Sequence, residues 1–288
     1  MARAMKRTRP SEIKRLLAAE DIIPSRVLGQ NFLVDENILN IILDSAHLAE
    51  DDVVLEVGPG LGVLTEHLIP RAHRVIAIEK DPRLAAYLRE QFGAQPTLHL
   101  IEGDALDQNL AMMLKNEHVT HVISNLPYSS GTRILLELID AEDRPLRMIV
   151  MLQTDVAERL AAGHGSKAYG VSSIHAQMYY DVVLRKTVSP SCFYPPPDVR
   201  SAIVEFYRRS EPQIVLRDTA HFNGLVKWCF SQRRKQVGRL LLNAPAAVVP
   251  ADRDVPAVLE QAKVRPDQRP ESIPVTAWGE LSNRLCAR

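Results

Sequence analysis

The sequence predicts an α/β fold, in which a mostly parallel sheet is covered by helices and is followed by a small helical domain. Short apolar segments of strand length recur through the first two thirds of the chain, and segments with helical spacing separate them. Beyond residue 210 the helical spacing continues without strands. The 288 residues suffice for one large and one small domain, and the composition is that of an ordinary globular protein.

Five apolar segments are expected to form parallel strands. They are residues 53–57, 74–78, 98–101, 121–124 and 148–152. The clearest helical segments between them are residues 61–69, 82–92 and 132–139. Asp81 and Pro82 make a good helix start, because Asp caps free N–H groups and Pro fits the first helical position.

A proline-rich loop, residues 189–198, separates two further apolar segments, 182–188 and 201–207, which we expect to pair as antiparallel strands at the end of the sheet. Helices are expected after Pro212, at residues 219–230, 234–242 and 255–262. We therefore predict three parts: a basic N-terminal extension (1–26), an α/β domain (27–210) and a helical domain (211–288).

Charge is informative only through its distribution, because 35 Lys and Arg balance 35 Asp and Glu. Six basic residues and one acidic residue lie in the first fifteen positions, and nine basic and three acidic residues lie between Arg200 and Arg239. Such clusters are typical of nucleic-acid-binding proteins, although a basic tail and a solvated helix face produce the same pattern.

The three widely spaced cysteines predict neither a disulfide framework nor a C-x-x-C metal site, and the nine histidines show no metal-like spacing. No apolar run approaches the roughly 18 residues that span a bilayer, and no secretory segment follows the N-terminus. We expect a cytoplasmic protein without a metal or a membrane contact, with a transit peptide as the alternative for the Arg-rich N-terminus.

A glycine-rich turn follows the first strand, with Gly58, Gly60 and Gly62 placed so that the backbone can turn sharply and approach a ligand. Val63 stands where the dinucleotide fingerprint has its third glycine, and an acid such as Glu56 is uncommon just ahead of a pyrophosphate-binding turn. The pattern therefore favours S-adenosylmethionine, which carries a positive sulfonium and no pyrophosphate, over a nicotinamide cofactor.

Acidic residues follow the next two strands. Glu79, at the end of the second strand, is placed to accept hydrogen bonds from both ribose hydroxyls of an adenosyl group. Asp104, after the third strand, is placed to accept the adenine amine of the cofactor, although an Asp in this position is more often a turn former.

The sequence Asn125-Leu126-Pro127-Tyr128 follows the fourth strand, at the edge where open α/β sheets bind their ligands. The exocyclic amine of adenine is a poor nucleophile, because its lone pair is delocalised into the ring. The Asn125 amide oxygen and the Leu126 carbonyl would accept its two N–H groups and orient the lone pair. Pro127 would stiffen the turn, and Tyr128 would stack on the extruded base.

Eight motifs together resemble those of the KsgA/Dim1 family of small-subunit (16S) ribosomal RNA adenine N6,N6-dimethyltransferases, from about Val27 to the C-terminus. The motifs are L-G-Q-N-F-L (28–33), E-V-G-P-G-L-G (56–62), E-G-D-A (102–105), N-L-P-Y (125–128), L-Q-T-D-V-A-E-R-L (152–160), G-S-K-A-Y-G (165–170), F-Y-P-P-P-D-V-R-S (193–201) and Q-R-R-K (232–235).

The resemblance implies a Rossmann-like S-adenosylmethionine methyltransferase sheet with a small C-terminal helical domain that binds rRNA. It implies dimethylation of two adjacent adenosines near the 3′ end of 16S rRNA, in the immature 30S ribosomal subunit. Nothing in the sequence suggests a dimer surface, so we expect a monomer. By the same resemblance, Phe193 would face Tyr128 across the target base, and two further sets of residues would bind the cofactor and the RNA. The cofactor set is Asn31, Leu33, Gly58, Gly60, Glu79, Asp104 and Asn125, and the RNA set is Arg233, Arg234 and Lys235.

Two alternatives stay open. A 23S rRNA adenine methyltransferase of the macrolide-resistance type shares the catalytic motifs, although N-L-P-Y and G-S-K-A-Y-G favour the small subunit. A non-catalytic 30S assembly factor is the second alternative, and the intact cofactor motifs argue against it. The basic extension before Val27 is longer than many bacterial relatives need, and we expect it to be mobile and to contact RNA.

Overall fold

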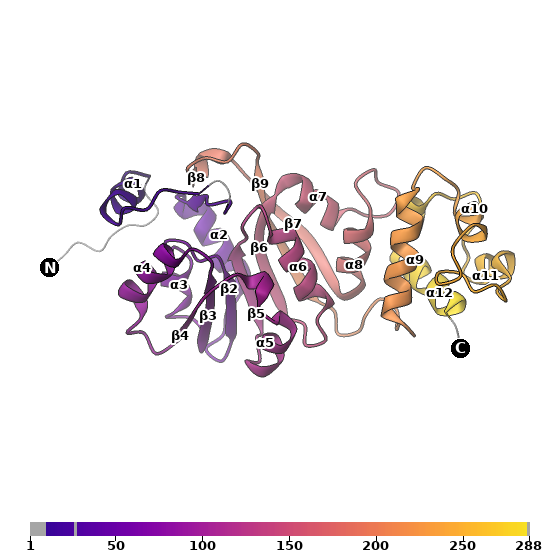
Figure 1. The fold of residues 1–288 in the computed structure, drawn as a ribbon, viewed down its shortest axis with the longest axis horizontal. Coiled ribbons are helices and arrows are strands. Elements are labelled where there is room, and N and C mark those ends of the chain that lie inside the picture. Colours follow the sequence, from indigo (N-terminus) through magenta and orange to yellow (C-terminus); the bar gives the residue numbers. More distant parts are fainter. Residues whose placement is uncertain (1–9, 26–27, 287–288) are drawn as a thin grey trace. The chain divides into compact units, whose positions relative to one another are not determined.

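The computed structural model describes residues 10–25 and 28–286, and these form two compact units (Figure 1). The first unit comprises Met1–Ala157 and Val183–Arg208, and the second comprises Glu158–Val182 and Arg209–Arg288. The chain passes from the first unit to the second for the last time between Arg208 and Arg209, close to the expected boundary at residue 210. The segment Glu158–Val182 differs from expectation, because it joins the helical unit although strands of the first unit precede and follow it.

The central sheet formed by the described residues has seven strands. In spatial order they are β4 (Leu98–Glu102), β3 (Arg74–Glu79), β2 (Val53–Val57), β5 (His121–Asn125), β6 (Arg147–Gln153), β9 (Ser201–Arg208) and β7 (Tyr180–Val188). The first five strands in this order, β4, β3, β2, β5 and β6, are parallel, and β9 is antiparallel to β6. The α/β prediction is confirmed, and the five expected parallel strands are correct to within one residue at each end.

Helices of the first unit precede the central sheet or connect its strands. They are α1 (Pro10–Ala19), α2 (Glu36–Ala46), α3 (Thr65–Leu68), α4 (Pro82–Phe92), α5 (Leu110–Asn116) and α6 (Gly131–Asp140), with short 3-10 turns η1 (Ala105–Asp107) and η2 (Pro190–Cys192). Helix α7 (Thr154–Ala161) crosses the boundary between the units. The start of α4 is as predicted, since Asp81 Oδ1 accepts a hydrogen bond from Arg83 N at 3.0 Å.

A second, two-stranded sheet was not predicted from the sequence. Strand β1 (Phe32–Leu33) pairs antiparallel with β8 (Phe193–Tyr194), with Phe32 opposite Tyr194 and Leu33 opposite Phe193. Both strands are too short for a periodic pattern to reveal them. Their pairing brings the Q-N-F-L segment against the start of the proline-rich loop.

Helix α1 corrects the expectation that the N-terminal extension is mobile. Ile13, Leu16 and Leu17 are buried, and they belong to a cluster that also contains Phe32 and Leu84. The Lys14 ammonium lies 5.1 Å from the centroid of the Tyr194 ring. Residues 10–25 are therefore a packed part of the first unit, whereas residues 1–9 and 26 lie outside the described residues.

The second unit is helical, as predicted. Its helices are α8 (Val171–Tyr179), α9 (Thr219–Ser231), α10 (Val237–Leu242), α11 (Val255–Gln261) and α12 (Val275–Leu285), with a 3-10 turn η3 (Pro270–Ser272). Tyr169, Phe222 and Trp278 are buried at its centre. Helices α8 and α12 were not predicted, and the unit has its own hydrophobic core.

Replacement of Ile13 by Ala tests whether α1 is part of the folded unit. Ile13 is 0% exposed, so the truncation should lower the free energy of unfolding by about 2–4 kcal/mol. Urea unfolding followed by circular dichroism provides the measurement. Arg15→Ala, at a side chain that is 72% exposed, should change the stability by less than about 0.5 kcal/mol. Equal small effects of both variants would show that α1 is not packed in solution.

Candidate active site

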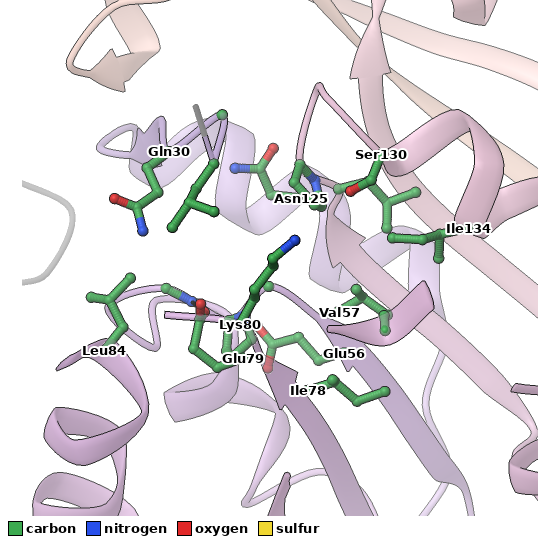
Figure 2. Close-up of a pocket in the computed structure, with 18 of the residues that line it drawn as sticks. Gln30, Glu56, Val57, Ile78, Glu79, Lys80, Leu84, Asn125, Ser130 and Ile134 are labelled. Carbon is green, nitrogen blue, oxygen red and sulfur yellow. Dashed lines mark hydrogen bonds between the residues drawn. The ribbon is translucent and has the colours of Figure 1, made fainter. Parts of the chain in front are cut away.

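A cavity of about 230 Å³ lies at the carboxyl ends of β2, β3, β4 and β5 (Figure 2). All residues expected to hold a cofactor line it, as do three expected at the chemical site. These ten residues are Asn31, Leu33, Gly58, Gly60, Glu79, Asp104, Asn125, Leu126, Pro127 and Tyr128. The sequence motifs thus converge on one place, because parallel strands all end at the same edge of the sheet.

The glycine turn has a backbone that other residues would strain. Gly58, Gly60 and Gly62 have φ values of 71°, 60° and 76°. A Cβ on Gly60 would lie 3.1 Å from the Phe32 ring, and a Cβ on Gly62 would lie 2.6 Å from Cε2 of Phe92. This left-handed turn also explains why α3 begins at Thr65 and is shorter than the expected helix 61–69.

Glu79 joins the glycine turn to the start of α4. Its Oε2 accepts a hydrogen bond from Gly60 N and its Oε1 accepts one from Asp81 N, both at 2.9 Å. Burial raises the pKa of Glu79, while the backbone donors oppose that rise. Each carboxylate oxygen can accept more than one hydrogen bond, so ribose hydroxyls can still bind.

Glu56 differs from the simple carboxylate assumed from the sequence. Its side chain is 1% exposed and accepts a hydrogen bond from Thr65 Oγ1 at 2.7 Å. Burial raises the pKa of Glu56 to about 8, so the side chain is largely protonated at neutral pH. A cation entering the cavity would favour the ionised form by direct charge attraction.

Lys80 is a cavity residue that sequence reasoning missed, and its side chain points into the cavity in Figure 2. Lys80 Nζ lies 2.5 Å from Asp104 Oδ2, and Asp104 Oδ1 accepts a hydrogen bond from Leu106 N at 3.0 Å. The Lys80 hydrogen bond lowers the pKa of Asp104. The carboxylate expected to bind an adenine amine is therefore paired with a cation in this structure.

Asn125 carries the most informative polar atom in the cavity. Its Nδ2 donates a hydrogen bond to Asn31 O at 3.0 Å, which orients the amide. Its Oδ1 is buried and has no hydrogen-bond partner among the described residues. A buried acceptor without a partner costs about 1–3 kcal/mol, so this oxygen favours a ligand that brings an N–H group.

The turn after Asn125 is held by its own backbone. Leu126 N donates to Met151 O at 3.3 Å, and the Pro127 carbonyl accepts hydrogen bonds from Ser130 N and Gly131 N. The Pro127 carbonyl therefore closes the turn into α6. Leu126, whose carbonyl was expected to accept one N–H group of the target amine, lines the cavity.

The two aromatic residues have different surroundings. Tyr128 lines the cavity and its hydroxyl is hydrogen-bonded to Ser201, while burial raises the pKa of the phenol. Phe193 is 3% exposed, packs in a core cluster with Leu33 and Ile203, and does not line the cavity. The stacking role expected of Phe193 stays a prediction, which requires its ring to become accessible.

The basic residues expected to bind RNA lie in the second unit and are not equivalent. Arg234 and Lys235 line a separate cavity of about 890 Å³, together with Arg239, which ends the basic cluster of the sequence, and Arg269, which sequence reasoning missed. Arg233 instead donates a hydrogen bond to Lys167 O at 3.0 Å, and its Nε lies 4.0 Å from a Glu271 carboxylate oxygen. We therefore expect Arg233 to organise the surface more than to bind a phosphate.

Neither a metal site nor a membrane segment is found within residues 10–25 and 28–286. No three His, Cys, Asp or Glu side chains gather there in a way that would hold a metal ion. No helix in these ranges is both long enough and apolar enough to cross a bilayer.

The chain is similar over most of its length to one protein family and to methyltransferases of known name. A family model described as "Ribosomal RNA adenine dimethylase" matches residues 25–273. Ribosomal RNA small subunit methyltransferase A of Geobacter metallireducens is 36% identical over 273 residues, which cover 94% of this chain and 98% of the relative. The protein of the same name from Latilactobacillus sakei is 35% identical over 280 residues, covering 96% and 94%.

Two solved structures share the fold over most of the chain. A dimethyladenosine transferase from Plasmodium falciparum superposes with a TM-score of 0.75 and 25% identity, covering 86% of this chain and 95% of that one. The 23S rRNA methyltransferase ErmE superposes with a TM-score of 0.68 and 26% identity, covering 88% and 99%. Both similarities extend well beyond the residues that line the cavity.

The raised pKa of Glu56 predicts a pH-dependent stability in the absence of cofactor. The folded protein binds the Glu56 proton more tightly than the unfolded chain, so the contribution of Glu56 to stability is largest at low pH. It should fall as the pH rises from about 5 to about 8, by up to about 1.4 kcal/mol per pH unit. Glu56→Gln keeps an acceptor for Thr65 and should lose this slope. Urea unfolding at several pH values measures both proteins, and parallel curves would contradict the prediction.

Proposed function

Because the chain belongs to the ribosomal RNA adenine dimethylase family, we propose that it dimethylates the N6 amines of two adjacent adenosines near the 3′ end of 16S rRNA. The methyl donor is S-adenosylmethionine, and the substrate is the immature 30S ribosomal subunit. The observation that carries the proposal is the oriented, unpaired Oδ1 of Asn125 in a cavity at the sheet edge. An acceptor in this position fits an amine substrate.

S-adenosylmethionine, when bound, supplies a methyl group on a positively charged sulfur. In the proposed complex, Glu79 accepts the ribose hydroxyls and Asp104 accepts the adenine amine, while Asn31, Leu33 and the glycine turn complete the walls. Lys80 is paired with Asp104 and has to share or release that carboxylate. Glu56 directly precedes the glycine turn, and burial disfavours its ionised form. The positive charge of the bound sulfonium would favour ionisation, so that Glu56 would stabilise the cofactor by charge attraction.

The chemical step depends on positioning more than on proton transfer. Asn125 Oδ1 and the Leu126 carbonyl accept the two N–H groups of the target amine, so that its lone pair is directed out of the base plane. Tyr128 stacks on the extruded base, an interaction that contributes roughly 1–3 kcal/mol per base. Holding both reactants in an attack geometry can lower the barrier by about 7–11 kcal/mol in the best cases. No covalent nucleophile is needed.

The helical unit supplies affinity for RNA. Arg234 and Lys235 carry positive charge on a cavity with Arg239 and Arg269, and neutralising phosphates there would release bound counterions. We propose that the protein acts as a monomer in the cytoplasm. A comparison of methyl transfer to immature 30S and 50S subunits tests the choice of substrate, and label confined to 23S rRNA would favour the macrolide-resistance type of activity.

Replacement of Asn125 by Ala should lower the rate of methyl transfer by at least about a hundredfold, because the amine loses the acceptor that orients it. RNA affinity should change little, since the substitution removes no positive charge. Asn109→Ala removes an exposed amide that caps α5 and serves as the matched control. Transfer at the wild-type rate by the Asn125 variant would exclude the proposed orientation of the amine.

Removal of two charges separates the roles of the basic residues. The double variant Arg234→Gln, Lys235→Gln should bind 16S rRNA more weakly, and the slope of log affinity against log salt should decrease by about 1.5 to 2. Arg233→Gln should change this slope less, because Arg233 is already bound to Lys167 and Glu271. Lys115→Gln, in α5, is the control for general charge. An unchanged slope in the double variant would show that the cavity does not contact phosphates.

A further inference from the structure

We propose that Ser201 is a positioning residue that holds the ring of Tyr128 in place for the target base. This inference rests on the proposed function and adds a residue to it. Ser201 does not line the cavity, so it acts through Tyr128. The two residues are 73 positions apart in the sequence, and their hydroxyl groups are hydrogen-bonded to each other.

Ser201 is a fixed point of the first unit. It is the first residue of β9, it lies opposite Gln153 of β6 in the sheet, and it is 0% exposed. Burial makes an unpaired hydroxyl costly. The Ser201 hydroxyl is therefore a rigid partner for the phenol, in contrast to a solvent-exposed side chain that could move with it.

The backbone of Tyr128 is also held. The Pro127 carbonyl accepts hydrogen bonds from Ser130 N and Gly131 N, which closes the turn around Tyr128. Gly29 approaches so closely that a Cβ on it would lie 3.2 Å from Tyr128 N. With the backbone fixed at one end and the hydroxyl bound at the other, the ring cannot swing away from the cavity.

The hydrogen bond also favours one orientation of the ring. The hydrogen of a phenol hydroxyl prefers to lie in the plane of the ring, so a partner in a fixed place favours one ring plane. Burial keeps the phenol protonated and able to donate. A ring that is already oriented loses less conformational freedom when the base stacks on it, which is the usual advantage of preorganisation.

The test is a double-mutant cycle with wild type, Ser201→Ala, Tyr128→Phe and the double variant. Steady-state kcat and KM for immature 30S subunits, the Kd for S-adenosylmethionine and the thermal midpoint are measured for each. We expect Ser201→Ala to lower kcat/KM by about tenfold, with an unchanged cofactor Kd. In the Tyr128→Phe background, which lacks the phenol hydroxyl, the same change should have almost no further effect.

Ser45→Ala is the matched control, because Ser45 is a buried serine of α2 that does not line the cavity. It should leave kcat/KM unchanged. Equal losses from Ser201→Ala in both backgrounds would overturn the inference and leave the proposed function intact, because Ser201 would then act without the phenol. A wild-type protein that transfers no methyl group to 16S rRNA would overturn both.

Discussion

The buried carboxylate of Glu79 holds together the two loops on which the cavity at the sheet edge depends. Its oxygens accept hydrogen bonds from Gly60 N and Asp81 N, so the turn after β2 and the start of α4 are fixed to the end of β3. Strands β2 and β3 are parallel and in register, with Val57 opposite Ile78, and both loops therefore leave the sheet at one edge. A tight glycine turn leaves backbone N–H groups without helical or sheet partners, and an acceptor at the next strand end satisfies one of them.

The opposite wall of the cavity is built by residues that precede the sheet. Gln30 donates a hydrogen bond to Asp81 at 2.9 Å, and Asn31 O accepts one from Asn125. The next two residues form β1, which pairs with β8. Helix α1 packs in the same cluster as Phe32. The N-terminal helix thus supports the wall of the candidate active site, which gives it a structural role that its basic composition alone does not suggest.

Affinity for RNA and methyl transfer are assigned to different units. The first unit holds the oriented amide of Asn125, the ring of Tyr128 and the glycine turn, whereas the cavity with four cationic side chains belongs to the second. Phosphate contacts contribute affinity and register but carry little information about bases. In the proposed function, recognition of an individual adenine depends on acceptors such as Asn125 Oδ1, which discriminate by hydrogen bonding. A net charge of zero is compatible with this arrangement, because the positive charge is concentrated where phosphates are expected.

The sequence by itself determined the strands, the glycine turn and the convergence of acidic residues with N-L-P-Y at one edge. Buried parallel strands appear as apolar runs, turns have characteristic residues, and the edge follows from strand direction. Only the tertiary structure decided the pairing of β1 with β8, the partners of Lys80 and Arg233, the burial of Phe193 and the bond between Tyr128 and Ser201. Local patterns encode periodicity and turn chemistry, whereas contacts between distant segments depend on the register and complementarity of surfaces that exist only once the chain has folded.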